Sequence, residues 1–298
     1  MRTPVLVVVN PAAGGGRARR IWRRLRERGL VPGDWEGVET RGLHHARELA
    51  RTAASRGDDR VVVVGGDGTV SAVASGLVGS SCALAIIPGG SGNDFGRALG
   101  VPVAPAAAAR LAATGVARPV DVGEIRFDRD RGYFVNVASF GFDAHVAQHA
   151  QASCLRFGGT FRYLVGMLRT LRRLRPSRVQ IDLDGRQLER SVLLLAVANG
   201  ACYGGGLRIA PDARLDDGYL DLCVVRGLSP AAVLGLLPRV YWGGHRHHPG
   251  VELLRCQRAQ VWGPAGLPGQ ADGERLPALP ATFSLRPSAL RCVAPSAP

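Results

Sequence analysis

Lysine is absent from this sequence. All 38 basic residues of the 298-residue chain are arginine, and against 24 acidic residues they give a formal net charge of +14. This charge has two possible explanations. It could reflect a composition bias that also makes alanine, glycine and proline abundant, or it could serve to attract phosphates, anionic lipid or nucleic acid. We expect no nucleic-acid partner, because the sequence contains no recognised nucleic-acid-binding module.

Long apolar runs and paired cysteines are also missing. No stretch of 18 or more apolar residues occurs, which predicts that no transmembrane helix is present. The apolar run Val5–Val9 is too short for a signal-peptide core. The six cysteines are scattered and none forms a CxxC pair, so the pattern indicates neither a zinc knuckle nor a disulfide framework. We therefore expect a cytoplasmic protein.

The N-terminal part of the chain alternates strand and helix patterns. Continuous apolar runs predict buried parallel strands at Val5–Val9, Val61–Val64 and Ala83–Ile87, with a weaker strand near Trp35–Thr40. Helical spacing occurs between and after them, at Arg17–Arg28, His44–Arg56, Val70–Leu77 and Ala106–Ala113. This alternation predicts a doubly wound α/β sheet.

Strand patterns dominate the rest of the chain and predict a C-terminal β-sandwich domain. They lie at Tyr133–Val137, Arg178–Leu183, Ser191–Ala198, Leu220–Val225, Gln260–Trp262 and Thr282–Leu285. One basic amphipathic helix, Thr160–Arg175, could lie on anionic lipid or pack on the sandwich. We expect residues 1–122 to form the α/β domain and 123–287 the sandwich, with 288–298 returning to the first domain.

Three glycine-rich loops, at residues 10–16, 65–69 and 88–94, each follow a predicted strand and precede a helix. They should therefore open on one edge of the sheet, where backbone N–H groups and helix N-termini bind phosphate. Asp67 would repel phosphates unless it holds Mg²⁺; otherwise it is a helix N-cap, a role that Thr69 could fill equally well. Ser91 and Asn93 could donate to phosphate oxygens.

The ordered motifs resemble the diacylglycerol kinase catalytic-domain superfamily, in particular bacterial lipid kinases related to diacylglycerol and sphingosine kinases. The Gly-Gly-Asp-Gly loop alone is also found in NAD kinases and phosphofructokinases, but the resemblance covers essentially the whole chain. It implies an NAD-kinase/diacylglycerol-kinase-like α/β domain, a β-sandwich and an active site between them. The motifs are Val8–Pro11 with the glycines after it, Gly65–Thr69, Pro88–Phe95, Asn136–Ala144, Ala210–Ala213 with Leu215–Asp221, and Asp272–Glu274.

The resemblance also implies roles for individual residues. Glu274 matches the general base that takes the proton of the lipid hydroxyl, and Asp67 matches the carboxylate needed for productive Mg²⁺–ATP binding. A second Mg²⁺ would be bound by the backbone carbonyls of Arg214 and Tyr219 and by the Asp217 carboxylate. ATP would contact Asn10, Pro11, Ala12, Ala13, Gly14, Thr40, Gly66, Asp67, Gly68, Thr69, Val70, Ser71, Ala72 and Ser91.

The sequence departs from the family at two points. Relatives usually carry Asn-Glu where this chain has Ser71-Ala72, and lysines near the phosphates can only be arginines here, for example Arg17. We expect an ATP-dependent lipid kinase that meets its lipid substrate at the inner face of the membrane, with a homodimer left open. The alternatives are an NAD kinase-like enzyme and a catalytically idle nucleotide- or lipid-binding regulator.

Overall fold

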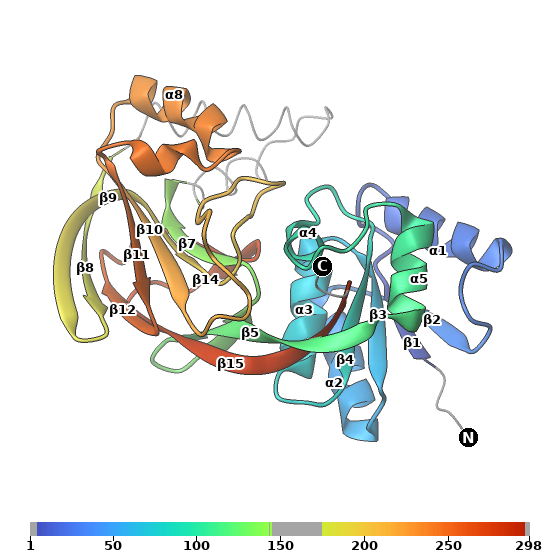
Figure 1. Cartoon of the computed structure of the whole chain (residues 1–298). Coiled ribbons are helices and arrows are strands. Elements are labelled where there is room, and N and C mark those ends of the chain that lie inside the picture. Colours follow the sequence, from blue (N-terminus) through green and yellow to red (C-terminus); the bar gives the residue numbers. More distant parts are fainter. Residues whose placement is uncertain (1–4, 143, 145–174, 296–298) are drawn as a thin grey trace.

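The computed structural model describes residues 5–142, 144 and 175–295 (Figure 1). Apart from its last residue, the helix predicted at Thr160–Arg175 lies outside this range. The described chain forms an N-terminal α/β domain and a C-terminal β domain that lie side by side. None of the described helices is both long and apolar enough to cross a membrane.

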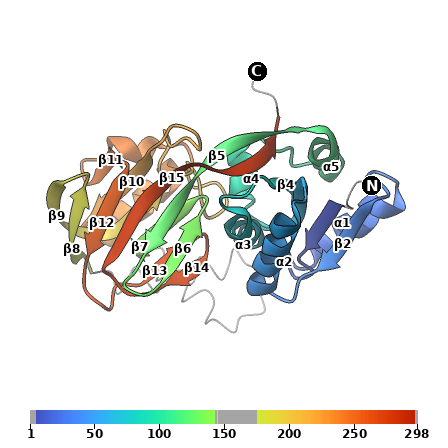
Figure 2. The ribbon, with the colours of Figure 1, turned by 90° about the horizontal axis from the view of Figure 1, so that it is seen from below.

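The N-terminal domain is built on parallel strands in the order β4-β3-β1-β2. The valines, leucines and isoleucines of the inner strands β1, β3 and β4 are almost all buried, since helices cover both faces. Helices α1 and α5 pack together, as do α2 and α3 (Figure 2), so the prediction of a doubly wound sheet is confirmed. The elements are β1 (Val5–Val9), α1 (Arg17–Glu27), β2 (Trp35–Glu39), α2 (Leu43–Arg56), β3 (Arg60–Gly65), α3 (Asp67–Leu77), β4 (Ala83–Pro88), α4 (Asp94–Ala98) and α5 (Pro105–Thr114).

The C-terminal domain is a β-sandwich whose main core includes the edge-to-face contacts of Phe283 with Phe134 and Phe140. The single strand predicted at Tyr133–Val137 is instead two strands, β6 and β7, separated by two residues. The elements of the C-terminal domain are β6 (Arg131–Phe134), β7 (Val137–Gly141), β8 (Ser177–Leu183), β9 (Arg186–Ala198), β10 (Leu220–Arg226), α8 (Pro230–Val240), the 3-10 helix η1 (Gly244–His247), β11 (Val251–Cys256), β12 (Arg258–Trp262), β13 (Gly269–Ala271) and β14 (Glu274–Leu276).

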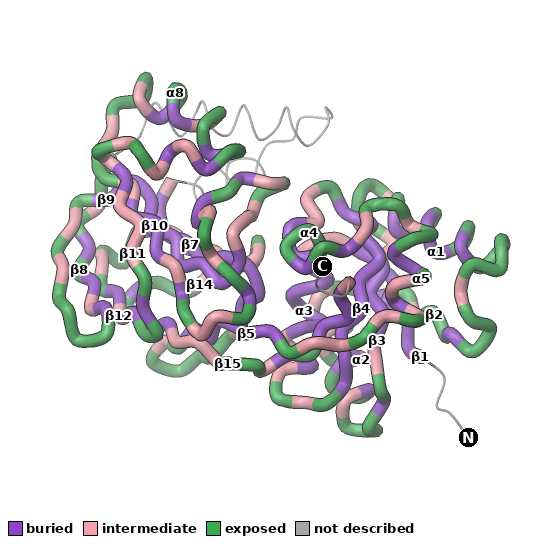
Figure 3. Tube along the Cα trace, viewed as in Figure 1, coloured by how far each residue is buried: buried purple, intermediate pink, exposed green. Residues whose placement is uncertain are grey.

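Two long strands, β5 (Val116–Arg126) and β15 (Ala281–Ala294), run through both domains. They pair antiparallel with each other, and β15 also pairs parallel with β4 at Arg291 and Cys292. The proposed domain boundaries at residues 122 and 287 therefore fall inside continuous strands. Figure 3 shows that buried segments of both domains extend to the region where they meet.

Candidate functional site

The three glycine loops converge at the carboxyl ends of β1, β3 and β4. A methyl group added to Gly14 would lie 2.5 Å from the carbonyl oxygen of Gly89, and one added to Gly90 would lie 2.4 Å from the Cα atom of Gly66. The first and second loops are also joined by a hydrogen bond of 2.8 Å from Asn10 Nδ2 to Thr69 Oγ1. Only glycine permits such close approach of backbones.

The residues expected to contact nucleotide differ in accessibility. Of those in the first loop, Pro11 and Ala13 are half-buried whereas Ala12 and Gly14 are exposed. Ser91 is exposed as well, and Gly66 and Gly68 are half-buried. Thr40 is buried, and its N–H donates to the Val9 carbonyl at 2.8 Å.

The side chains of Val70 and Ala72 are buried in the core of the α/β domain. Any contact that these two residues make with a nucleotide must therefore come from the backbone. Asn93 adopts a left-handed conformation with φ 54°. Its side-chain amide hydrogen-bonds both the N–H and the C=O of Gly90 at 2.9 Å, so it holds the turn and keeps one N–H for other partners.

Asp67 lies at the first turn of α3 and faces a second carboxylate. Its Oδ1 atom accepts the backbone N–H groups of Asp94 at 2.6 Å and Phe95 at 3.3 Å, so it caps α4 rather than its own helix. Burial raises the pKa of Asp67, and the charge of the nearby Asp94 raises it further. Two adjacent carboxylates at a site with partial desolvation favour a bound cation.

The residues present fit Mg²⁺ at this position. Asp94 is 2% exposed and is balanced by Arg97, whose Nη1 atom lies 2.5 Å from its Oδ1 atom. Among the described residues no cluster of three or more histidine, cysteine or acidic side chains could bind a metal ion alone. An ion held by one or two carboxylates must complete its coordination with water and phosphate oxygens, as Mg²⁺ typically does beside nucleotides.

Asp272 forms hydrogen bonds with residues of both the α/β domain and the sandwich. It accepts hydrogen bonds from Ser71 Oγ at 2.8 Å and from the N–H groups of Val135, Asn136 and Val137 at 2.7, 3.0 and 3.1 Å. Burial raises the pKa of Asp272 to about 6, and these four hydrogen bonds oppose that rise. Ser71, which departs from the family pattern, therefore has a partner across the domain interface.

Glu274 begins β14, two residues after Asp272 in the tight turn that joins β13 to β14. The turn needs positive φ at both central positions, and Asp272 (48°) with Gly273 (89°) supplies it. The Glu274 side chain is 39% exposed, and its Oε2 atom lies 3.6 Å from Arg47 Nη2 on α2. The Glu274 carboxylate is therefore accessible to solvent beside the α/β domain, and the turn at Asp272 and Gly273 fixes the position of its backbone.

The loop that resembles a second metal site is held by protein contacts. Both oxygens of Asp217 have partners: Oδ1 accepts the Tyr219 N–H at 3.2 Å, and Oδ2 pairs with Arg255. Arg255 also lies 4.5 Å from the centre of the Tyr219 ring. The side chain of Arg214, whose backbone carbonyl was the expected ligand, pairs with Asp216. The Asp217 carboxylate is therefore neutralised by a guanidinium in this structure, and a second Mg²⁺ at this loop stays a prediction.

Asp94 and Gly205 belong to the site although neither was predicted from the sequence as a site residue. In the structure Asp94 Oδ2 accepts the Gly205 N–H at 2.7 Å, which joins the third loop to a glycine turn of the sandwich. Gly204, Gly205 and Gly206 all have positive φ. Three consecutive glycines were the available signal, but no local pattern identifies their distant partner.

Comparison with known proteins was made for the whole chain. The profile of the diacylglycerol kinase catalytic domain matches residues 4–125, and that of the YegS C-terminal NAD kinase beta sandwich-like domain matches residues 136–294. The chain is 36% identical to a diacylglycerol kinase of Mycobacterium tuberculosis strain H37Rv, covering 98% of this chain and 95% of the relative.

Two further proteins agree with these matches. The chain is 32% identical to a Pseudomonas aeruginosa PAO1 protein named "Probable lipid kinase YegS-like", covering 98% of this chain and 94% of that protein. A crystal structure of a candidate diacylglycerol kinase from Bacillus anthracis str. Sterne superposes with a TM-score of 0.81 at 27% identity, covering 98% of this chain and 95% of that one.

Proposed function

Because this chain belongs to the diacylglycerol kinase family, whose members are phosphotransferases with an alcohol group as acceptor, we propose that it transfers the γ-phosphate of ATP to the hydroxyl of a diacylglycerol-like lipid. The observation that carries this proposal is the convergence of three glycine loops beside the turn that bears Glu274. Ser71 and Asp272 join the two parts by a 2.8 Å hydrogen bond.

The nucleotide part of the site would use backbone groups. The exposed glycines of loop 10–16 and the N-termini of α1 and α3 present N–H groups and partial positive charge to the phosphates. Asp67 would hold Mg²⁺, with the negative charge of Asp94 beside it, and the ion would supply neutralisation of phosphate charge when bound. Arg97 and Arg17 are the cations nearest in sequence to these loops.

Glu274 would accept the proton of the lipid hydroxyl as that oxygen attacks the γ-phosphate. A general base contributes typically about 10²–10⁴-fold to such a reaction. Arg47 and the Asp272 turn would orient the Glu274 carboxylate, since catalysis of phosphoryl transfer rests mainly on positioning. The Ser71–Asp272 contact argues against an idle regulator, because the residue that departs from the family here supports the turn that carries the base.

The test is a transfer assay with radiolabelled ATP. Purified protein is incubated with [γ-³²P]ATP, Mg²⁺ and one of three acceptors: dioctanoylglycerol in mixed micelles, a total bacterial lipid extract, or NAD⁺. We expect labelled phosphatidic acid from the first acceptor and a labelled lipid from the second. Labelled NADP⁺ with inert lipids would instead establish an NAD kinase, and ATP binding without any transfer would establish a regulator.

A further inference from the structure

Helix α8 leaves an apolar face uncovered. Val233, Leu236 and Val240 are buried against the sandwich. The residues on the other side are exposed, namely Leu234 (44%), Pro238, Tyr241 (52%) and Trp242 (76%), and we call these four the α8 surface. A helix that is apolar on both faces needs a second apolar neighbour or a membrane.

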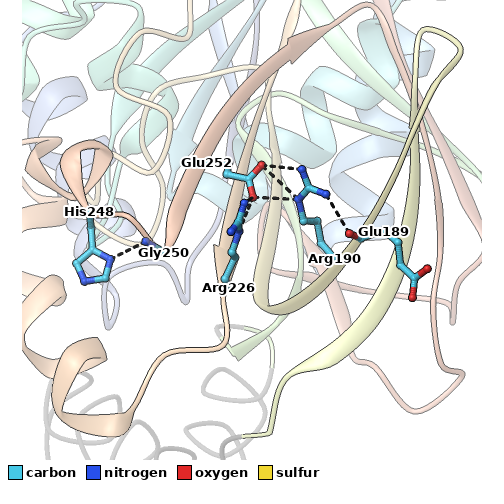
Figure 4. Close-up of polar contacts among 6 residues, drawn as sticks. All are labelled: Glu189, Arg190, Arg226, His248, Gly250 and Glu252. Atoms are coloured by element: carbon cyan, nitrogen blue, oxygen red, sulfur yellow. Dashed lines mark hydrogen bonds and ion pairs between the residues drawn. The ribbon is translucent and has the colours of Figure 1, made fainter.

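The stretch of sequence that forms the α8 surface carries no acidic residue. No acidic residue occurs between residues 222 and 251. Asp212 pairs with Arg246, and Glu252 accepts hydrogen bonds from Arg190 and Arg226 (Figure 4). Arg239 on α8 is exposed and forms no ion pair among the described residues. The charge of this region therefore suits a negatively charged partner.

Hydrogen bonds hold the helix and the segment that follows it in place. Ser229 caps the helix by accepting the N–H of Ala232 at 3.2 Å. Beyond the helix, the buried His245 lies 3.0 Å from the carbonyl oxygen of Ile209, and His248 accepts the N–H of Gly250 at 3.0 Å (Figure 4). The exposed side chains of Tyr241 and Trp242 thus lie in a segment that is hydrogen-bonded on both sides.

Helix α8 is connected to the proposed site through residues 205–208. The Val240 carbonyl at the end of α8 accepts the Arg208 N–H at 3.1 Å. Three residues before Arg208, Gly205 donates to Asp94 beside Asp67. In Figure 1, α8 lies at the end of the sandwich opposite the strands β5 and β15 that bridge the domains. A partner bound to α8 would therefore lie at the end of the sandwich away from these two strands.

We infer that the α8 surface docks on an anionic lipid bilayer, with Trp242, Tyr241 and Leu234 in the interfacial region and Arg239 at the lipid phosphates. Tryptophan and tyrosine favour this region because each ring has an apolar body and a polar group. Apolar burial combined with attraction to anionic lipid is how interfacial helices bind. This inference rests on the proposed lipid substrate and names the surface that brings the site to it.

Tryptophan fluorescence and vesicle sedimentation test the inference without ATP. The full chain is mixed with phosphatidylcholine vesicles that contain either no phosphatidylglycerol or about 30%. Trp22 and Trp35 are buried at 8% and 5% exposure and Trp262 is 37% exposed, so Trp242 should dominate a blue shift on binding. Trp242→Ala should weaken vesicle binding at least about tenfold, since it removes a large exposed apolar group. Trp262→Ala on β12 is the matched control and should bind as the wild type does.

Three results would overturn the inference: equal vesicle binding by Trp242→Ala and Trp262→Ala, no preference for anionic vesicles, or a Trp242 shift that follows protein concentration and not lipid, which would indicate a second copy. Circular dichroism checks that the variants are folded. The transfer assay separates this inference from the proposed function. If docking is correct, Trp242→Ala lowers the ratio of transfer on vesicles to transfer on dispersed dioctanoylglycerol. Wild-type protein that binds vesicles but phosphorylates no lipid would refute only the proposed function.

Discussion

Replacing Asp272 with asparagine should destabilise the protein while keeping the shape of the turn, since asparagine also tolerates positive φ. The Oδ1 position can still accept the N–H groups of Asn136 and Val137. The amide nitrogen replaces Oδ2 and faces the Val135 N–H, which then lacks an acceptor. Val135 is 2% exposed, so water cannot replace the lost bond.

The expected cost follows from that geometry. One buried donor without a partner costs about 1–3 kcal/mol, and we expect a loss of stability of that size. For a chain of this size that lowers the melting temperature by about 2–5 °C. Differential scanning calorimetry at pH 8, above the pKa of about 6 for Asp272, measures it directly.

Asp184→Asn is the matched control. Asp184 also begins an Asp-Gly turn with positive φ (50°) and accepts backbone N–H groups, those of Gln257 and Arg258, but it is exposed. Water can replace those bonds, so we expect a change of less than about 1 kcal/mol. Equal shifts in the two variants would refute the view that the Asp272 carboxylate satisfies a backbone donor that water cannot reach.

The raised pKa of Asp272 adds a second readout. Its folded-state pKa of about 6 lies above the value of about 4 expected in the unfolded chain. The stability that the group contributes is therefore fully present below pH 4 and declines as the pH rises to 6. The penalty of Asp272→Asn should shrink over this window and stay constant above it. A penalty that grows between pH 4 and 6 would contradict the raised pKa.

Two further variants probe the glycine loops and the 214–219 loop. A methyl group on Gly92 would lie 2.7 Å from Asp67 Oδ2, so Gly92→Ala should weaken Mg²⁺–ATP binding at least tenfold by calorimetry (about 1.4 kcal/mol). Gly132→Ala is the control, because a methyl group there would meet open space, and it should bind as the wild type does. Equal affinities of the two variants would contradict the carboxylate site. Arg255→Gln should lower the melting temperature by about 1–2 °C, and Mg²⁺ alone should leave the wild type unchanged. Strong stabilisation of the wild type by Mg²⁺ without nucleotide would restore the second metal site.

Much of the fold could be predicted from the sequence because the α/β domain is built from local patterns. The valine runs at β1 and β3 predict buried parallel strands, and the glycine loops after them must lie on one edge. Strand β5 was missed because Pro119 and Gly123 interrupt its apolar pattern. Helix α8 was missed because Gly235 and Pro238 are poor helix formers, and packing against the sandwich overrides that propensity.

The contacts that assemble the candidate site were harder to predict. Ser71 and Asp272 are 201 residues apart, and Asp94 and Gly205 are 111 apart. Such pairs leave no periodicity in the chain, so only the three-dimensional structure reveals them. Ser71 departs from the family pattern, and the structure gives it a partner in the opposite domain. The pairing of Asp217 with Arg255 likewise joins residues that are distant in the sequence.

The most direct test of the central claim is single-turnover phosphate transfer by Glu274→Gln, with ATP affinity measured on the same protein. We predict that transfer to dioctanoylglycerol falls by about 10²–10⁴-fold while ATP affinity stays within about threefold of the wild type, and that Arg275→Gln in the same strand transfers normally. Transfer at the wild-type rate by Glu274→Gln would contradict the account, because the glycine loops would then face a cleft without its base.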